Sequence, residues 1–264
     1  MAAKPKFGLA LGAGATRGLA HLGVLQVFQE HGLQFDCIAG TSVGAIFGAL
    51  YAAGNDFNKL EKLASQLKEG QLLDLAVPRW GLIRGDRIEA LVRVLTRGLT
   101  FSELKVPFYV VAVDIEKGEL VVINKGRVAD AVRASIAIPG IFTPKRLDRR
   151  LLVDGAVLAP LPVEVLRQHG AEVVVAVDVS YTVAKKEVEK ISNLFELLFH
   201  SLSLTGKAIT CRSLEQADLV IRPAVGHLNP ARLHRAVECI ELGRQAALEA
   251  LPQLENLFSR RKTN

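Results

Sequence analysis

Residues 38–54 read IAGTSVGAIFGALYAAG, and this stretch decides how the rest of the chain is interpreted. Its first apolar residues lead into GTSVG at 40–44, which matches the G-x-S-x-G pattern of a nucleophile elbow, a sharp turn between a strand and a helix. Small residues then recur at every fourth position from Gly44 to Ala52, which is typical of a helix that packs closely against a sheet. The stretch therefore predicts a strand, an elbow with Ser42 at its tip, and a buried helix.

The elbow is chemically useful because it presents one hydroxyl at the positive end of a helix. Gly40 and Gly44 make room for the strained backbone that the turn imposes on Ser42. The hydroxyl then lies above the N-terminus of the next helix, where backbone N–H groups stabilise a developing negative charge. The alternative is an ordinary serine N-cap, which the same position between a strand and a helix would also favour.

A glycine-rich loop precedes the elbow. Residues 12–18 read GAGATRG and follow an apolar run at 7–11 that predicts the first strand. Because neighbouring parallel strands end at the same edge of a sheet, we expect this loop beside Ser42, with its backbone amides as an oxyanion hole. A dinucleotide-binding turn is the rival interpretation, but it requires an acidic residue at the end of the second strand. The only candidate, Asp36, stands at the start of that strand.

A serine nucleophile needs a base, and the histidines do not supply an obvious one. All six except His227 fall within predicted helices or at their ends, where packing or surface roles are the default. Asp154, in LLVDGA at 151–156, ends a short apolar strand and precedes a turn. That position places a carboxylate at the edge of the sheet where we expect Ser42, although an ordinary turn aspartate gives the same pattern.

Apolar runs alternate with helical patterns along the chain, which predicts an α/β protein with a largely parallel sheet covered on both faces. We expect one domain over residues 1–264, with a core at about 6–180 and a C-terminal helical region at about 187–250 packed on it. Residues 72–84 combine proline, tryptophan and glycine without a clear period, which predicts a mobile flap near the mouth of the site, with a packed loop as the alternative. Further elements are expected as strands at 35–39, 108–114, 120–123 and 173–178, and as helices near 187–209 and 231–250.

Composition limits the classes of function. The 33 basic and 27 acidic residues give a net charge of +6, without an arginine-rich helix or a basic stripe interleaved with aromatic residues, so nucleic acid is not an expected partner. The three cysteines show neither a disulfide framework nor the spacing of zinc ligands, which suits a reducing cytoplasm. The uncharged stretch 37–55 is too interrupted by glycine to predict a membrane span. Weak attraction to an anionic lipid surface is one use of the basic excess, and solubility is another.

Taken together, the blocks GLALGAGATRGLAHLGVL at 8–25, VRASIAIPGIF at 132–142, LVDGAVLAPLPV at 152–163 and VVVAVDVS at 173–180, with the elbow, resemble the patatin-like phospholipases over nearly the whole chain. The resemblance implies a three-layer α/β/α fold and a serine–aspartate dyad that works without histidine, cofactor or metal. It implies these roles: Ser42 as nucleophile and Asp154 as base; Gly12, Ala13, Gly14 and Ala15 as the oxyanion loop; Arg17 and Gly18 as its support; Gly40 and Gly44 as the elbow; Gly155 as part of the Asp-Gly motif.

Two departures from that family concern the loop. Ala13 and Ala15 stand where glycine is common, and a positive φ at either position would be strained. The function that we expect is a serine acyl hydrolase of carboxylic, lipid or phospholipid esters, in the cytoplasm or at the surface of a membrane. A patatin-like regulatory or scaffold protein with little turnover is the alternative, since the dyad is intact in either case. The sequence leaves the acyl chain length, the headgroup and the oligomeric state open.

Overall fold

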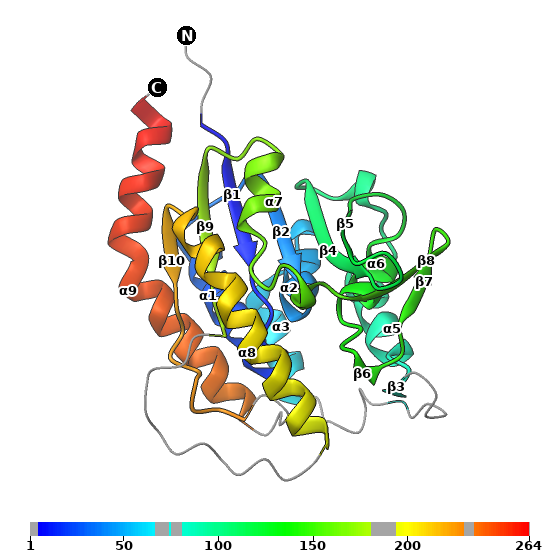
Figure 1. Ribbon diagram of the computed structural model, residues 1–264. Helices are drawn as coiled ribbons and strands as arrows, with labels where there is room; N and C mark the ends of the chain where they lie inside the picture. Colours follow the sequence, from blue (N-terminus) through cyan, green and yellow to red (C-terminus); the bar gives the residue numbers. More distant parts are fainter. Residues whose placement is uncertain (1–4, 67–73, 75–80, 181–193, 230–234, 264) are drawn as a thin grey trace.

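The computed structural model describes residues 5–66, 74, 81–180, 194–229 and 235–263 (Figure 1). In this part of the chain, eight strands form one mixed sheet in the order β10-β9-β1-β2-β4-β8-β7, with β5 paired to β4. The strands of this sheet are β1 (Phe7–Leu11), β2 (Cys37–Thr41), β4 (Phe108–Asp114), β5 (Glu119–Ile123), β7 (Lys145–Leu147), β8 (Arg150–Asp154), β9 (Val173–Val177) and β10 (Leu219–Ile221). The five strands from β10 to β4 are parallel, whereas β5, β8 and β7 are antiparallel additions.

The pairing of strands along the two edges of β4 brings the ends of β2 and β8 together. One edge is occupied by β5, which pairs with β4 from Val110 to Asp114. β2 and β8 must therefore share the other edge, where β2 pairs as far as Val111 and β8 pairs from Ala112 onward. Because β2 is parallel to β4 and β8 is antiparallel, the two strands run toward each other and their last residues meet.

Helices cover both faces of the sheet. The α-helices are α1 (Ala20–Glu30), α2 (Val43–Ala52), α3 (Phe57–Gln66), α5 (Asp86–Leu95), α6 (Val128–Ser135), α7 (Val163–Gln168), α8 (Leu194–Glu215) and α9 (Ala236–Thr263). Short 3₁₀ turns are η1 (Ala15–Leu19), η2 (Phe101–Glu103) and η3 (Gly155–Val157), and β3 (Gly81–Ile83) pairs with β6 (Gly140–Phe142) outside the main sheet. α1, α2 and α9 pack on one face, while α7 and α8 lie on the other, which gives the expected three layers (Figure 1).

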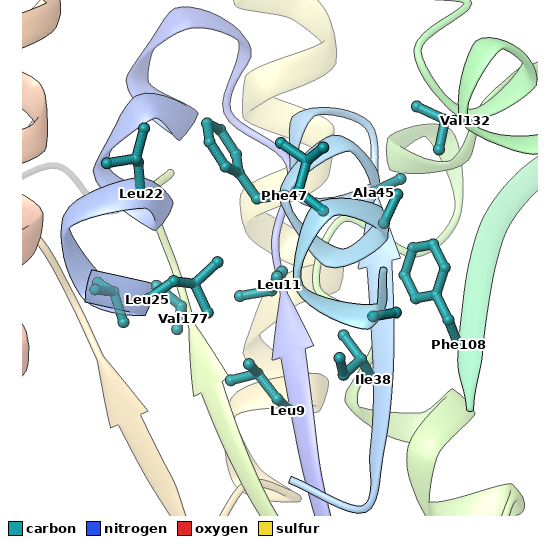
Figure 2. Close-up of a cluster of buried hydrophobic side chains, with 14 of the residues drawn as sticks. Leu9, Leu11, Leu22, Leu25, Ile38, Ala45, Phe47, Phe108, Val132 and Val177 are labelled. Carbon is teal, nitrogen blue, oxygen red and sulfur yellow. The ribbon is translucent and has the colours of Figure 1, made fainter. Parts of the chain in front are cut away.

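Alternation along the central strands separates the two layers of core. Leu9 and Leu11 of β1 point into the larger cluster, whereas Ala10 between them points into the smaller cluster under α7. Figure 2 shows the larger cluster, in which side chains of α1 and α2 interdigitate with the sheet: Leu9, Leu11, Leu22, Leu25, Ile38, Ala45, Phe47, Phe108, Val132 and Val177. On β1 and β2, large side chains thus pack on the face under α1 and α2, whereas the smaller Ala10, Cys37 and Ala39 face α7.

Several boundaries differ from the sequence-based expectation. The second strand runs from Cys37 to Thr41 rather than over 35–39, because Phe35 turns into the core against Phe28 and the strand continues to the elbow. α8 extends to Glu215. α9 continues through Pro252 to Thr263, and Phe258 near its end packs on the core, where its ring is tilted against that of Phe7 with the ring centroids 4.4 Å apart. The single domain over 1–264 stays a prediction. Among the described helices, none has the length and apolar character needed to cross a membrane.

Candidate active site

Ser42 occupies a strained turn between β2 and α2. Its φ of 57° and ψ of −124° lie outside the regions that ordinary residues favour, as a nucleophile elbow requires. Added Cβ atoms would lie 2.6 Å from the carbonyl oxygen of Gly44 at position 40 and 2.1 Å from that of Leu11 at position 44. Both positions therefore need glycine, because any side chain would push the elbow away from the sheet.

Asp154 meets Ser42 where the ends of β2 and β8 converge. Ser42 Oγ donates a hydrogen bond of 2.6 Å to Asp154 Oδ2, and Ala156 N–H donates one of 2.8 Å to Oδ1. The side chains of the pair are buried, with 5% of Ser42 and 2% of Asp154 exposed. Asp154 ends a strand and lies beside Ser42, as the sequence led us to expect. The strand, β8, is antiparallel to β4, and its register of Asp154 opposite Ala112 makes the contact.

Burial changes the acid–base chemistry of this carboxyl group. Removal from water raises the pKa of Asp154 from 3.8 to about 7, and the hydrogen bonds from Ser42 and Ala156 offset part of that rise. A group with a pKa near 7 can both accept and return a proton close to neutrality. An aspartate with its ordinary pKa would be a much weaker base at the same pH.

The glycine-rich loop lies against the elbow. A Cβ at Gly18 would collide with Val43 at 2.2 Å, so the loop packs directly on the residue after the nucleophile. Gly12 N–H donates to Val177 O at 3.1 Å and Ala13 N–H to Pro160 O at 2.8 Å. These two amides are therefore occupied within the fold.

The next two amides of the loop are the ones left for an anion. Gly14 N–H and Ala15 N–H have no hydrogen-bond partner among the residues that the structure describes. A positive φ, which would be strained at Ala13 or Ala15, occurs at one of the two. Ala15 has a φ of 49°, whereas Ala13 is not in the left-handed region.

Arg17 ties the loop to the C-terminal part of the chain. Its Nε donates to Leu228 O at 2.8 Å and its Nη2 to Gly226 O at 2.9 Å, and burial lowers the pKa of the guanidinium. A second tie comes from the chain after Asp154: Ala159 O accepts a bond of 2.8 Å from Thr41 Oγ1, next to the Pro160 carbonyl that holds Ala13. All three bonds end on backbone carbonyls and therefore do not depend on the side chains of the accepting residues.

Within the described residues, no histidine ring makes a hydrogen bond to either Ser42 or Asp154. His21 is fully buried behind the loop, where one ring nitrogen lies 2.8 Å from Gly12 O, and burial lowers its pKa to about 4. A neutral ring can therefore donate to that carbonyl at ordinary pH. His234 lies outside the described residues.

The structure also bears on the dinucleotide-binding alternative, on the flap and on metal binding. Asp36 Oδ2 accepts a bond of 2.7 Å from Phe7 N–H, at the opposite end of β1 from the loop, so it cannot hold a ribose bound there. Most of the proposed flap at 72–84, including Trp80, lies outside the described residues, but 81–83 form β3. No group of three or more histidine, cysteine or acidic side chains with the spacing of a metal site occurs in the described part.

Ser135 is a buried site residue that the sequence did not single out. It ends α6, is 0% exposed, and its Oγ accepts a bond of 2.8 Å from Ser42 N–H. The partners are 93 residues apart in the chain. The only signal was its place in the VRASIAIPGIF block, since no local pattern reveals a contact of this range.

The sequence of the chain is similar to that of several known proteins. Residues 9–167 match the Patatin family, described as patatin-like phospholipase. An uncharacterized NTE family protein of Mycobacterium tuberculosis (strain ATCC 25618 / H37Rv) is 38% identical over 178 residues, which cover 67% of this chain and 49% of the relative. A second such protein from the same strain is 31% identical over 274 aligned residues, covering 94% of this chain and 47% of the relative. The chain thus spans about half the length of these relatives.

A solved structure has the same fold. VipD from Legionella pneumophila superposes with a TM-score of 0.67 at 15% sequence identity, over 96% of this chain and 67% of that one. At this level of identity the likeness concerns the arrangement of the sheet and its helices.

Proposed function

The chain belongs to the patatin-like phospholipase family, and on that premise we propose that it is a serine acyl hydrolase that cleaves lipid esters with Ser42 and Asp154 as a catalytic dyad. The observation that carries the proposal is the direct bond of 2.6 Å between Ser42 Oγ and Asp154 Oδ2 in a buried, strained elbow. A triad would place an imidazole between the hydroxyl and the carboxylate. Here the carboxylate itself contacts the nucleophile.

In the first step, Ser42 Oγ attacks the ester carbonyl while its proton passes to Asp154 Oδ2. Gly14 N–H and Ala15 N–H hold the negative oxygen of the tetrahedral intermediate, since neither amide is occupied by another described residue. The intermediate collapses, the ester C–O bond breaks, and Asp154 returns its proton to the leaving alcohol. An acyl group is then attached to Ser42.

In the second step, water attacks the acyl-enzyme and gives a proton to Asp154. The fatty acid leaves as the Ser42 C–O bond breaks, and Asp154 restores the proton to Ser42 Oγ. Because the pKa of Asp154 is near 7, we expect kcat/KM to rise with pH through an acid limb at about pH 7. The His21 ring, with a pKa of about 4, does not account for such a limb.

Apolar side chains near Asp154 favour an acyl substrate. α8 lies across the segments that flank it, with Gly206 beside Pro160 and Leu198 beside Gly140. Leu197 and Leu204 of the same helix are 49% and 67% exposed, and Leu158 after η3 is 39% exposed. Exposed leucines on the helix that packs against η3, and on the segment after η3, suit a lipid chain or a lipid surface better than a polar ester.

The test is hydrolysis of p-nitrophenyl esters of increasing acyl length, with Ser42→Ala as the matched variant. We expect turnover by the wild type, a preference for longer acyl chains, and loss of at least about 10³-fold in Ser42→Ala. Turnover that Ser42→Ala leaves intact would place the nucleophile elsewhere. No release above buffer at any acyl length, from protein that is folded by circular dichroism, would favour the regulatory alternative.

A histidine base is tested separately. His234→Ala and His227→Ala should each keep most of the activity, because the proposed proton transfer runs directly between Ser42 and Asp154. A fall in either variant as deep as that of Ser42→Ala, without unfolding, would indicate a triad.

A further inference from the structure

The C-terminal turn of α6 contacts the backbone of both dyad residues, although neither chemical step uses it. Ser135 Oγ accepts the bond of 2.8 Å from Ser42 N–H. Two residues later, the carbonyl of Ala137 accepts a bond of 2.9 Å from Asp154 N–H. One short segment therefore holds the main chain of the nucleophile and of the base.

The Ser135 hydroxyl lies at the junction where β2 and β8 meet on β4. Besides accepting from Ser42, it donates a bond of 2.6 Å to the carbonyl of Val111, the last residue of β4 that pairs with β2. The side chain is 0% exposed, so water cannot replace it in either bond. The hydroxyl thus uses its donor and one acceptor position to join the residue that follows β2 to the backbone of β4.

The same carbonyl also contacts the base side of the site. A Cβ at Gly155 would lie 2.3 Å from Val111 O, which shows how closely the residue after Asp154 packs on it. Through one oxygen atom, Ser135 therefore connects the elbow with the Asp-Gly turn. A shift of this side chain would move Ser42 and Asp154 relative to each other.

We propose that Ser135 is a positioning residue that sets the separation between Ser42 Oγ and the Asp154 carboxylate. The proposal rests on the dyad function proposed for those two residues. The elbow is held at a φ of 57° against its own preference, so loss of the bond to Ser42 N–H leaves a buried donor unpaired and a backbone free to relax. Relaxation would draw Oγ away from Oδ2.

The first experiment compares Ser135→Ala with the wild type in ester hydrolysis. We expect kcat to fall by roughly 10- to 100-fold with KM changed by less than about threefold, because displacements near 1 Å affect the reacting geometry more than binding. We also expect the acid limb of kcat/KM to move to higher pH. The reason is that the hydrogen bond from Ser42 lowers the pKa of Asp154, and a displaced hydroxyl no longer does so.

Thr96→Val supplies the matched control. Thr96 is also 0% exposed, and its Oγ1 donates a bond of 2.7 Å to Val92 O at the end of α5, away from the dyad. Both variants lose one buried hydroxyl and should lose a few degrees of Tm, but only Ser135→Ala should change kcat and the acid limb. Equal activity losses in the two variants, with an unchanged acid limb, would overturn the proposal.

Ser135→Cys can replace Ser135→Ala in these measurements if the alanine variant does not fold. Its thiol fills the space but forms weaker hydrogen bonds, so we expect a kcat between those of the wild type and Ser135→Ala, and full activity would contradict the role.

A measurement without turnover separates this proposal from the proposed function. The Asp154 carboxyl can be titrated by ¹³C NMR in the wild type and in Ser135→Cys. A higher pKa of Asp154 in the variant supports the positioning role even if the wild type hydrolyses no ester, and an unchanged pKa refutes it.

Discussion

Ser42 and Asp154 arrive at one point from regions that are organised differently. Ser42 has its strained backbone in a turn built mostly from its neighbours in sequence, namely the strand, the two flanking glycines and the helix that follows, to which the distant Ser135 adds one bond from Ser42 N–H. Asp154 is held by contacts far along the chain, namely the pairing of β8 with β4 and the bond from its N–H to Ala137. The position of the proposed nucleophile therefore depends mostly on local sequence, and that of the proposed base on strand register. Five experiments test this difference.

Removal of the base tests it most strongly. Asp154→Asn cannot accept the Ser42 proton, so we expect kcat/KM to fall by about 10³- to 10⁴-fold while circular dichroism is unchanged. Asp114→Asn is the matched control, since Asp114 is a carboxylate 2% exposed at the end of β4 that bonds the Glu116 amide. Activity of Asp154→Asn within tenfold of the control would mean that the register of β8 does not deliver the base.

The buried carboxylate should also lower stability at high pH. The pKa of Asp154 in the folded protein, about 7, exceeds its ordinary value of 3.8, so the folded state binds more protons between these pH values. The contribution of this carboxyl group to the free energy of unfolding is therefore largest below about pH 4, and it is lost as the pH rises to about 8. In urea unfolding, the free energy of unfolding of Asp154→Asn relative to that of the wild type should therefore rise by on the order of 2–4 kcal/mol between pH 4 and pH 8. An equal difference at both pH values would contradict a desolvated carboxylate.

A bulky residue in the oxyanion loop should reduce turnover on the nucleophile side. A Cβ at Gly14 would lie 2.6 Å from Val179 Cγ2, so Gly14→Val must displace the free amides at 14 and 15. We expect kcat to fall by about 10²-fold, the usual scale for losing one oxyanion donor. Partial recovery when Val179→Ala is added would confirm displacement as the cause, and near-normal turnover in Gly14→Val would move the oxyanion hole elsewhere.

Matched alanine substitutions compare the two sides directly. Gly44 and Gly155 each lie against a backbone carbonyl, where a Cβ would be 2.1 Å from Leu11 O and 2.3 Å from Val111 O. Both Gly44→Ala and Gly155→Ala should lose about 1–3 kcal/mol of unfolding free energy. Both should also move the acid limb of the pH–rate profile to higher pH, because each separates Ser42 from Asp154. Only Gly44→Ala, whose Cβ would also lie 2.8 Å from Gly12 O at the start of the glycine-rich loop, should in addition lower kcat well below that of Gly155→Ala. Equal kcat values in the two variants would erase the distinction between the two regions.

The smallest effect is expected at Ala15. Its φ of 49° strains an alanine, so Ala15→Gly should raise the unfolding free energy by less than about 1 kcal/mol in urea. Ala13→Gly is the control, because Ala13 is not in the left-handed region and glycine there should be destabilising by about 0.4–1 kcal/mol. Destabilisation by both changes would show that the loop gains nothing from glycine at 15.

The part of the site that the sequence could predict follows the same division. The elbow and the loop were found from GTSVG and GAGATRG because their geometry depends on residues within a few positions. Asp154 was expected near Ser42 from its place at the end of a strand, but the antiparallel register that makes the contact could not be predicted, since an apolar run does not reveal the direction of a strand. Ser135 was missed because its partners, Ser42 and Val111, become neighbours only when α6 packs under β4. The amides left free in the loop depended likewise on remote carbonyls at 160 and 177.

The anchors of the oxyanion loop also have a consequence for biosynthesis. Gly12 is bonded to Val177, and Arg17 to Gly226 and Leu228, so the loop is synthesised early but its partners come some 200 residues later. At roughly 5–20 residues per second on the ribosome, that interval lasts about 10–40 s. During it, the elbow can already form, whereas the glycine-rich loop has its contacts with Val43 and His21 but lacks its bonds to Val177, Gly226 and Leu228. The nascent chain is therefore expected to carry the proposed nucleophile in an inactive form until its C-terminal segments have emerged.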